Sequence, residues 1–309
     1  MAGSARFIFY SKKNNVKEYL FRHMQRKTTT IRRKKKYKLL TTAEVRVFRK
    51  KVYEYYDHAG RSLPWRKNPT PYRVLVSEVM LQQTQVERVI EKFQEFLSAI
   101  PNFNALARTP LLKLLKIWSG MGYNRRALAL KSLAQQVAHE HQGKLPRDPE
   151  QLCTLPGIGK YTASAIAAFA YNKPVVFMDT NIRRVFIHEF FPNRGAIHDG
   201  EIIPLVEQTL DTKAPRKWYN ALMDYGSMLK RENGNPNRKS VHYIRQSPFE
   251  NSNRQVRGRI LKVLVAESPL RVAQIVRKTD MASERVKANL LSLEQEGFIR
   301  KSGTGYSIG

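Results

Sequence analysis

The sequence is poor in cysteine and in acidic residues, and both shortages limit what the chain can be. Cys153 is the one cysteine among 309 residues, so the chain forms no internal disulfide and offers no set of thiolates for zinc or an iron–sulfur cluster. Its seven histidines form no H-E-x-x-H motif, and no metal site is predicted. No run of about 18 apolar residues occurs, so no membrane-spanning helix is predicted.

Acidic residues are outnumbered by lysine and arginine, 25 to 55, which gives a formal net charge of +30. Residues 1–40 contain 13 basic side chains and one acidic side chain, and residues 41–250 and 251–309 are also net positive. A basic balance in every segment is typical of proteins that bind a polyanion. Nucleic acid is the leading candidate, and an anionic membrane surface is the other.

Hydrophobic periodicity divides the chain into three parts. Residues 1–40 are too highly charged to fold alone and are predicted to be a flexible basic arm. Residues 41–250 repeat apolar residues at helical spacing, with one long run over residues 72–100, and predict an all-α domain. Residues 254–309 predict three helices and a hairpin around a Gly-Thr-Gly turn, which is the pattern of a winged-helix DNA-binding domain.

The stretch TLPGIGKYTASAIAAFA, residues 154–170, places a glycine-rich turn before an apolar helix. Gly157 and Gly159 allow a tight turn, and the helix that starts near Lys160 offers unpaired N–H groups and a positive dipole end. The stretch is not a nucleotide-binding P-loop, because Tyr161 stands where that motif needs Ser or Thr. We therefore expect a hairpin between helices that holds a nucleic-acid phosphate, as against an ordinary helix–helix turn.

This hairpin and three further motifs resemble the helix-hairpin-helix base-excision DNA glycosylases. Asp179 follows Tyr161 by eighteen residues in MDTNIRRV, as in that superfamily. LPWRKNPTPYRVLVSEVMLQQTQV, residues 63–86, and WSGMGYNRRALAL, residues 118–130, are similar to the MutY-type adenine DNA glycosylases in particular. The resemblance spans residues 45–230. It implies a mainly α, helix-hairpin-helix glycosylase fold and the flipping and hydrolytic removal of a mismatched base from DNA.

The resemblance also assigns roles to individual residues. It makes Asp179 the carboxylate that faces the sugar and Glu78 the acid that protonates adenine. The other assignments are Tyr161 and Asn181 beside the catalytic pair, Trp65, Arg66 and Asn220 in the base pocket, and Gln83, Thr84, Met121, Tyr123, Gly157, Gly159 and Lys160 at the DNA. Gln83 and Tyr123 are expected to fill the gap left by the flipped base. From the third C-terminal helix, Arg285 and Lys287 are expected to contact phosphates.

Adenine release calls for two carboxyl groups with different surroundings. Protonation of the ring removes the problem of a poor anionic leaving group, and an ionised carboxylate stabilises the oxocarbenium-like sugar that remains. Glu78 lies in the apolar run VLVSEVML, so burial is expected to raise its pKa. Asp179 opens a helix, whose dipole is expected to keep it ionised. Singly, a helical Glu is usually solvated and an Asp before a helix is usually an N-cap.

Departures from the family bear on the cofactor. Cysteine ligands of the family's iron–sulfur cluster should follow GSML, but the corresponding positions are Lys230, Asn237, Ser240 and Gln246. No cluster is therefore expected, and hydrogen bonds and packing are expected to hold this region. The one cofactor considered is a monovalent cation at the hairpin backbone.

Two further departures bear on activity and specificity. The winged helix stands in place of the family's 8-oxoguanine-reading domain, which leaves open which base the protein requires opposite the excised one. Tyr161 stands where glycosylases with lyase activity have a catalytic lysine, and Lys160 is turned about a quarter of a circle away. Glycosylase activity alone is therefore expected.

Three functions stay open at this point. The chain could remove adenine opposite 8-oxoguanine or guanine, remove thymine or uracil from mismatches with guanine, or bind DNA without catalysis. The run MLQQTQ and Asn220 favour adenine, whereas the presence of both Glu78 and Asp179 argues against an inactive protein. The expected partner is double-stranded DNA with a mismatched or damaged base pair, bound by a monomer and away from membranes.

Overall fold

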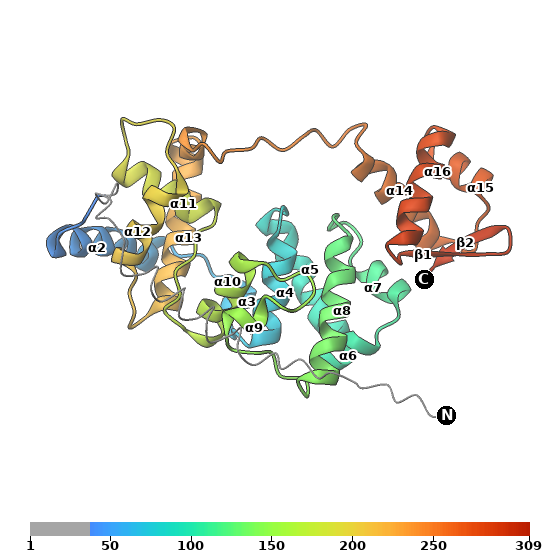
Figure 1. Cartoon of the computed structure of the whole chain (residues 1–309), viewed down its shortest axis with the longest axis horizontal. Helices are drawn as coiled ribbons and strands as arrows, with labels where there is room; N and C mark the ends of the chain where they lie inside the picture. The colour runs from blue at the N-terminus through green and yellow to red at the C-terminus, as the bar shows by residue number, and fades with distance from the viewer. Residues whose placement is uncertain (1–37) are drawn as a thin grey trace, which may run out of the picture. The chain divides into compact units, whose positions relative to one another are not determined.

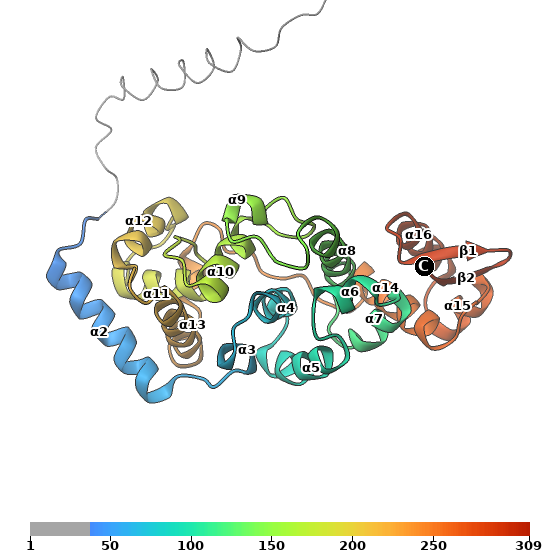
Figure 2. The same cartoon turned by 90° about the horizontal axis from the view of Figure 1, so that it is seen from below.

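The computed structural model describes residues 38–309, so almost all of the predicted basic arm lies outside the described residues. The described chain is mainly α, as predicted, and its one sheet has two strands (Figures 1 and 2). The helices are α2 (Thr42–Ala59), α3 (Pro64–Lys67), α4 (Pro71–Leu81), α5 (Val86–Ala99), α6 (Phe103–Arg108), α7 (Leu111–Ile117), α8 (Arg125–Glu140), α9 (Pro149–Leu152), α10 (Lys160–Tyr171), α11 (Thr180–Phe190), α12 (Asp199–Thr209), α13 (Pro215–Glu232), the 3₁₀ helix η1 (Pro236–Lys239), α14 (Asn253–Ala266), α15 (Val272–Thr279) and α16 (Ser283–Gln295). Among these, no helix has both the length and the apolar character that a membrane crossing requires.

Two groups of helices meet where α10 packs against α4. In the first group α13 contacts α2, α10 and α11, and its Trp218 ring lies edge-on to Phe48, with centroids 5.8 Å apart. In the second group α4 contacts α5 and α8, and the ring of Trp118 lies edge-on to Phe96 at 6.1 Å. Figure 2 shows the two groups to either side of α4 and α10. Each group therefore contains its own aromatic contacts. The contact between α10 and α4 is where a cleft between the groups can form.

The helical periodicity of residues 72–100 predicts one continuous helix, and this prediction is wrong. α4 ends at Leu81, α5 begins at Val86, and Gln83 between them has φ 55°, in the left-handed region. The buried guanidinium of Arg126 binds backbone carbonyls at the end of α4. Tertiary hydrogen bonds therefore override the local helical preference at this point.

The predicted hairpin is present between α9 and α10. Gly157 has φ 76°, and a Cβ atom there would lie 2.8 Å from the Cβ of Ala129 on α8. Gly159 is the N-cap of α10 and contributes no side-chain hydrogen bond. The turn therefore needs glycine at position 157 for both its backbone conformation and its close packing.

Hydrogen bonds and packing are present in the segment after α13. The amide of Ile197 donates to the Lys239 carbonyl at 3.0 Å, and the Asn237 side chain donates to the Thr180 carbonyl at 2.8 Å. Asn237 and Ser240 are buried. Because amide and hydroxyl groups stand where the resemblance places cluster ligands, these residues do not fit an iron–sulfur cluster.

The C-terminal helices α14, α15 and α16 are followed by a hairpin of β1 (Ile299–Ser302) and β2 (Gly305–Ile308), in the predicted order. The strands are antiparallel, with Ile299 opposite Ile308. Glu296, after α16, accepts hydrogen bonds from Arg125 at the start of α8 and from Arg257 on α14, each with one at 2.7 Å. This three-residue ion-pair cluster joins the C-terminal helices to the second group.

Candidate active site

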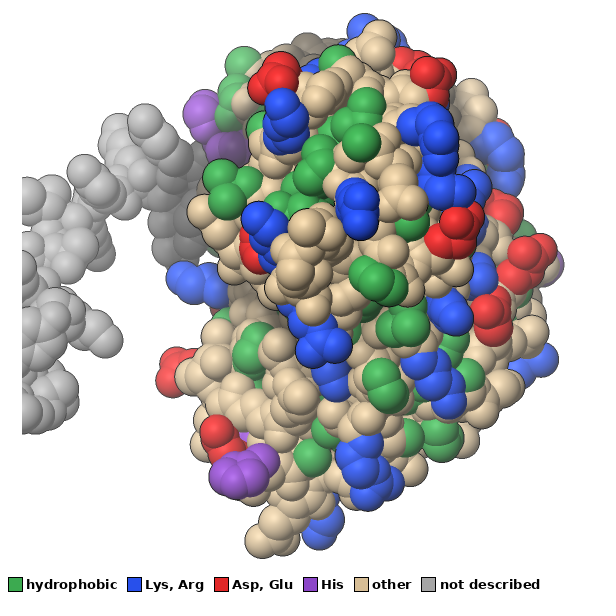
Figure 3. Space-filling view, turned by 90° about the vertical axis from the view of Figure 1, so that its right-hand side faces the viewer, with side chains coloured by type: hydrophobic (Ala, Val, Ile, Leu, Met, Phe, Trp, Pro, Cys, Tyr) green, Lys and Arg blue, Asp and Glu red, His purple; other side chains and the backbone are tan. Residues whose placement is uncertain are grey.

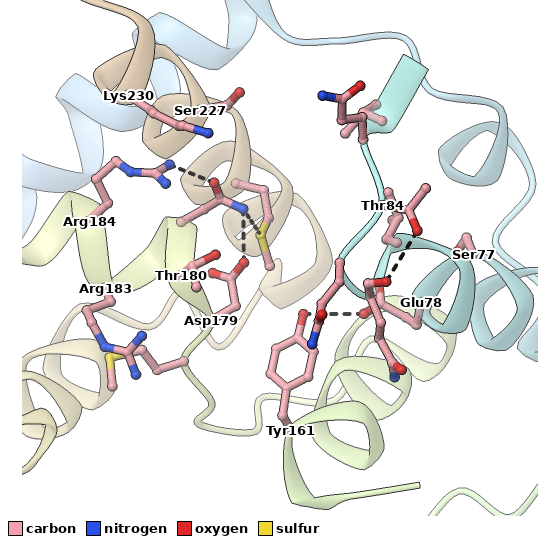
Figure 4. Close-up of a pocket in the computed structure, with 18 of the residues that line it drawn as sticks. Ser77, Glu78, Thr84, Tyr161, Asp179, Thr180, Arg183, Arg184, Ser227 and Lys230 are labelled. Carbon is pink, nitrogen blue, oxygen red and sulfur yellow. Dashed lines mark hydrogen bonds between the residues drawn. The ribbon is translucent and has the colours of Figure 1, made fainter. Parts of the chain in front are cut away.

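A cavity of about 1180 Å³ lies where α4, α10, α11 and α13 meet. The predicted site residues among those that line it are Glu78, Tyr161, Asp179, Asn181, Trp65, Arg66, Asn220, Gln83 and Thr84. Figure 4 shows Glu78 and Tyr161 on one side and Asp179 on the other. The exposed Lys160 does not line the cavity. The fold therefore gathers residues that are more than a hundred positions apart in the sequence.

Glu78 is the carboxyl group with fewer hydrogen-bond donors. It lies on α4 between the buried residues Ser77 and Val79, and the Tyr161 hydroxyl donates to its Oε2 at 3.3 Å. Burial and the nearby charge of Asp179 raise the pKa of Glu78 to about 7, although Tyr161 and Arg66 act to lower it. Near neutral pH, Glu78 can therefore hold and release a proton, which a general acid must do.

Asp179 is the N-cap of α11 and has two hydrogen-bond donors. Its Oδ1 accepts from the Ile182 amide at 2.7 Å, and its Oδ2 accepts from the Asn181 side chain at 2.9 Å. Burial nevertheless raises its pKa, because desolvation outweighs these hydrogen bonds. The N-cap geometry is present, and its hydrogen bonds act to lower the pKa of Asp179, whereas burial opposes them. That Asp179 is ionised stays a prediction.

Arg184 is a site residue that the sequence analysis missed. It is buried on α11, and its Nη1 donates to Asn181 Oδ1 at 2.8 Å and to the Gly226 carbonyl at 2.6 Å. Arg184 thus orients Asn181, which in turn binds Asp179. Figure 4 shows Arg184 and Asp179 on the same side of the cavity. Arg184 follows Asn181 by three residues, so both side chains lie on one face of α11. This spacing is the sequence feature from which Arg184 could have been identified.

The predicted base-pocket residues are held by the core. Trp65 is buried and lies edge-on to Phe93 at 5.6 Å. Arg66 donates to the buried Asp224 through its two terminal guanidinium nitrogens, Nη1 at 2.8 Å and Nη2 at 2.9 Å. Asp224 was not identified from the sequence, because it lies 158 positions from Arg66.

A second cavity, of about 1090 Å³, adjoins the loops that carry the predicted DNA contacts Gln83, Thr84, Met121 and Tyr123. Gln83 and Tyr123 both have positive φ, 55° and 46°, which is uncommon outside glycine and concentrates at functional sites. Arg126 fixes both loops. It donates to the Met80 carbonyl at 2.9 Å and to the Met121 carbonyl at 3.0 Å. Sequence analysis did not single out Arg126.

The remaining predicted DNA contacts lie outside the first cavity. Gly157, Gly159 and Lys160 are exposed at the start of α10. On α16, Lys287 is exposed and pairs with Glu284 at 3.0 Å, while Arg285 donates to the Asn251 carbonyl at 2.8 Å. A cation at the hairpin backbone stays a prediction. Among residues 38–309, no group of three or more His, Cys, Asp or Glu side chains is placed to hold a metal.

Comparison with known proteins connects this chain to DNA repair. Residues 76–200 match the family model described as "HhH-GPD superfamily base excision DNA repair protein". The chain is 34% identical over 277 residues to an adenine DNA glycosylase of Mycolicibacterium smegmatis, and the alignment covers 82% of this chain and 93% of that protein. It is 36% identical over 188 residues to an adenine DNA glycosylase of Buchnera aphidicola, covering 59% of this chain and only 53% of that protein. These findings confirm the resemblance inferred from the sequence motifs.

A solved structure shares the fold. The structure of a thermostable thymine-DNA glycosylase superposes with a TM-score of 0.54 and 28% sequence identity, covering 60% of this chain and 86% of that chain. The region with this fold therefore extends beyond the matched residues 76–200.

Proposed function

The chain belongs to the HhH-GPD superfamily of base excision DNA repair proteins, and we propose that it is a DNA glycosylase that removes adenine opposite 8-oxoguanine or guanine. The observation that carries the proposal is the placement of Glu78 and Asp179 across one cavity from each other (Figure 4). The 34% identity to an adenine DNA glycosylase, in an alignment that covers 93% of that protein, supports adenine as the base.

The proposed mechanism divides the work between the two carboxyl groups. Glu78 donates its proton to a ring nitrogen of the flipped adenine, and the electron pair of the N-glycosidic bond leaves with the base. Asp179 stabilises the positive charge that develops on the sugar. Water then adds to the sugar carbon and loses a proton, which completes hydrolysis.

Hydrolysis without strand cleavage is part of the proposal. A lyase step needs an amine that attacks the sugar carbon. Tyr161 lines the cavity and stands where the resemblance places the catalytic lysine of glycosylases with lyase activity, while the neighbouring Lys160 does not line the cavity. The product is therefore expected to be an intact strand with an abasic site.

The test is single-turnover base release from duplexes that contain A:8-oxoG, A:G, T:G or U:G. We expect release of adenine, followed by strand cleavage only after alkali treatment. Asp179→Asn should lower the rate roughly a hundredfold or more, because the sugar cation loses its counter-charge. Asp148→Asn is the matched control: Asp148 also caps a helix, but it does not line the cavity. Rapid release by Asp179→Asn would contradict the proposal.

Removal of thymine or uracil is the second candidate, favoured by the likeness to a thymine-DNA glycosylase. The T:G and U:G duplexes of the same panel decide between the two. Release of thymine or uracil with adenine left in place would support this candidate and overturn the first.

A further inference from the structure

The two cavities share one wall. Gln82, Gln83, Thr84 and Gln85, in the loop between α4 and α5, line both cavities. When a base leaves a duplex and enters the first cavity, its partner base stays on the opposite strand, across the gap. A side chain of this shared loop that fills the gap therefore has the flipped base on one side and the partner base on the other. The second cavity lies across this loop from the cavity that contains Glu78 and Asp179.

The segment of residues 241–254, here called the strap, reaches the second cavity from across the shared loop. Its residue Gln246 lines both cavities and donates to Gln83 Oε1 at 3.4 Å and to the Tyr123 hydroxyl. Arg254, at the end of the strap, also donates to the Tyr123 hydroxyl, and its guanidinium lies 5.4 Å from the centre of the Tyr123 ring. The strap thus places the amide of Gln246 at the shared wall and the guanidinium of Arg254 in the second cavity.

The lining of the second cavity suits a nucleotide. It includes Arg88, Arg254 and Lys262, and among the described residues that line it there is no Asp or Glu. The Tyr123 ring adds an aromatic surface against which a base can stack. Cations for phosphate, an aromatic ring for the base and hydrogen-bonding groups for its edge are therefore present together.

We propose that the second cavity receives the purine opposite the excised base and that Gln246 and Arg254 of the strap read its exposed edge. The proposal rests on the function proposed above and deepens it, because it assigns the opposite-base specificity to a segment outside the residues matched by the family model.

The two side chains complement two purines. Guanine presents O6 and N7 as acceptors, and an arginine can donate to both. In 8-oxoguanine, N7 carries a hydrogen and C8 a carbonyl group, so a contact that only donates loses one partner. The amide of Gln246 can accept from N7–H and donate to a neighbouring carbonyl, while Arg254 donates to O6. Cytosine and thymine offer neither edge.

The Glu296 cluster keeps Arg254 in place. Glu296 binds Arg125 on α8 and Arg257 on α14, one turn after Arg254. The start of α14 is thereby held beside the loop that carries Tyr123. Arg254 also donates to the Ser247 carbonyl at 2.8 Å, which fixes the strap to the same helix.

The experiment measures the dissociation constants of the full chain for duplexes with a tetrahydrofuran abasic-site analogue opposite 8-oxoguanine, guanine or cytosine. These duplexes contain no base to excise, so the result does not depend on adenine release. We expect the native chain to bind both purines more tightly than cytosine. Gln246→Ala should reduce the preference for 8-oxoguanine over guanine roughly tenfold, and Arg254→Ala should reduce both purine preferences by a similar factor, as for a bidentate base contact.

The matched control is Arg245→Ala, which removes a charge from the same exposed strap at a residue that lines neither cavity. This variant should leave the ratios between the dissociation constants for the three duplexes unchanged. If all three variants weaken binding equally to every duplex, the strap contacts only the phosphate backbone and the proposal is overturned. It is also overturned if the native chain does not distinguish purines from cytosine. Loss of adenine release with these ratios intact would instead overturn the proposed function alone.

Discussion

At the scale of the residue, the chemistry proposed for the first cavity depends on the unequal surroundings of two carboxyl groups. Glu78 receives one hydrogen bond, from a phenol at 3.3 Å, whereas Asp179 receives one from an amide at 2.7 Å and one from a side-chain amide at 2.9 Å. Hydrogen bonds from N–H groups favour the ionised form of a carboxyl group. Burial raises the pKa of both groups, but more hydrogen bonds oppose it at Asp179, so Asp179 is the better suited of the two to hold a charge and Glu78 to hold a proton.

The pH dependence of base release should report the pKa of Glu78. Because Glu78 must be protonated to act as the acid, and its pKa is raised to about 7, the single-turnover rate should fall as pH rises above that value. The fall should approach tenfold per pH unit. Glu78→Gln should lower the rate strongly and remove this dependence. A native rate that stays constant from about pH 6 to 9 would exclude Glu78 as the acid.

Stability gives an independent readout of the same group. The pKa of Glu78 lies above its ordinary value of 4.5 in the folded chain, so the folded state binds more protons between that value and about 7. Ionisation of Glu78 therefore destabilises the fold as pH rises through this interval. Glu78→Gln should accordingly show a higher melting temperature than the native chain at pH 8, with the difference lost at pH 4.

Sequence reasoning identified the two carboxyl groups that the structure brings to one cavity, and it missed the residues that orient them. Glu78 and Asp179 stand in motifs whose order and spacing can be recognised. Arg184, Asp224 and Arg126 act through backbone carbonyls or through partners far along the chain, as with the 158 positions between Arg66 and Asp224. Such contacts follow from the packing of helices, which hydrophobic periodicity alone does not specify.

At the scale of the element, the contact between α11 and α13 determines where Asp179 lies. A Cβ atom at Gly226 on α13 would come within 2.5 Å of the Asn181 carbonyl oxygen on α11. The Gly226 carbonyl also accepts a hydrogen bond from Arg184 at 2.6 Å. Close approach and hydrogen bonding together fix the first turn of α11, and with it Asp179.

Gly226→Ala should therefore lower both stability and base release. Overpacking of this kind costs about 1–3 kcal/mol, which corresponds to a fall in melting temperature of roughly 2–5 °C for a chain of this size. The rate should fall further than the folded fraction does, because Asn181 and Asp179 must move. The measurements are thermal unfolding and single-turnover kinetics.

Gly200→Ala is the control for this variant. Gly200 lies in helix α12, and a Cβ atom there meets no atom within 4 Å. Alanine at that position should stabilise the helix by up to about 1 kcal/mol. If Gly226→Ala behaves like Gly200→Ala, the close contact between α11 and α13 does not control the site.

The break between α4 and α5 shows the limit of element prediction. The periodicity of residues 72–100 continues through the shared loop, so it predicts one helix. The structure interrupts it because Arg126 binds the carbonyls there, and the interruption presents Gln83 at the wall between both cavities. By contrast, the hairpin before α10 could be predicted, because glycine and proline mark it in the sequence.

At the scale of the whole molecule, positive charge is distributed well beyond the two cavities. Figure 3 shows Lys and Arg side chains spread over the face that includes the C-terminal helices, interspersed with apolar ones. Contacts with phosphates position a protein on DNA without reading its sequence. We therefore expect this face to contribute affinity and its salt dependence, and the strap to contribute discrimination.

Lys287→Ala tests this division. Lys287 is exposed on α16, so loss of one phosphate contact should reduce the slope of log K against log salt concentration by about 0.9. The control Lys50→Ala removes another exposed lysine that is paired with a glutamate on its own helix, α2, and should leave the slope unchanged. Binding is measured by titration of a duplex across a series of salt concentrations. The ratios between the dissociation constants for the 8-oxoguanine, guanine and cytosine duplexes should stay constant in both variants, because a phosphate contact is common to all three duplexes. A changed ratio in Lys287→Ala at an unchanged slope would show instead that α16 reads the opposite base.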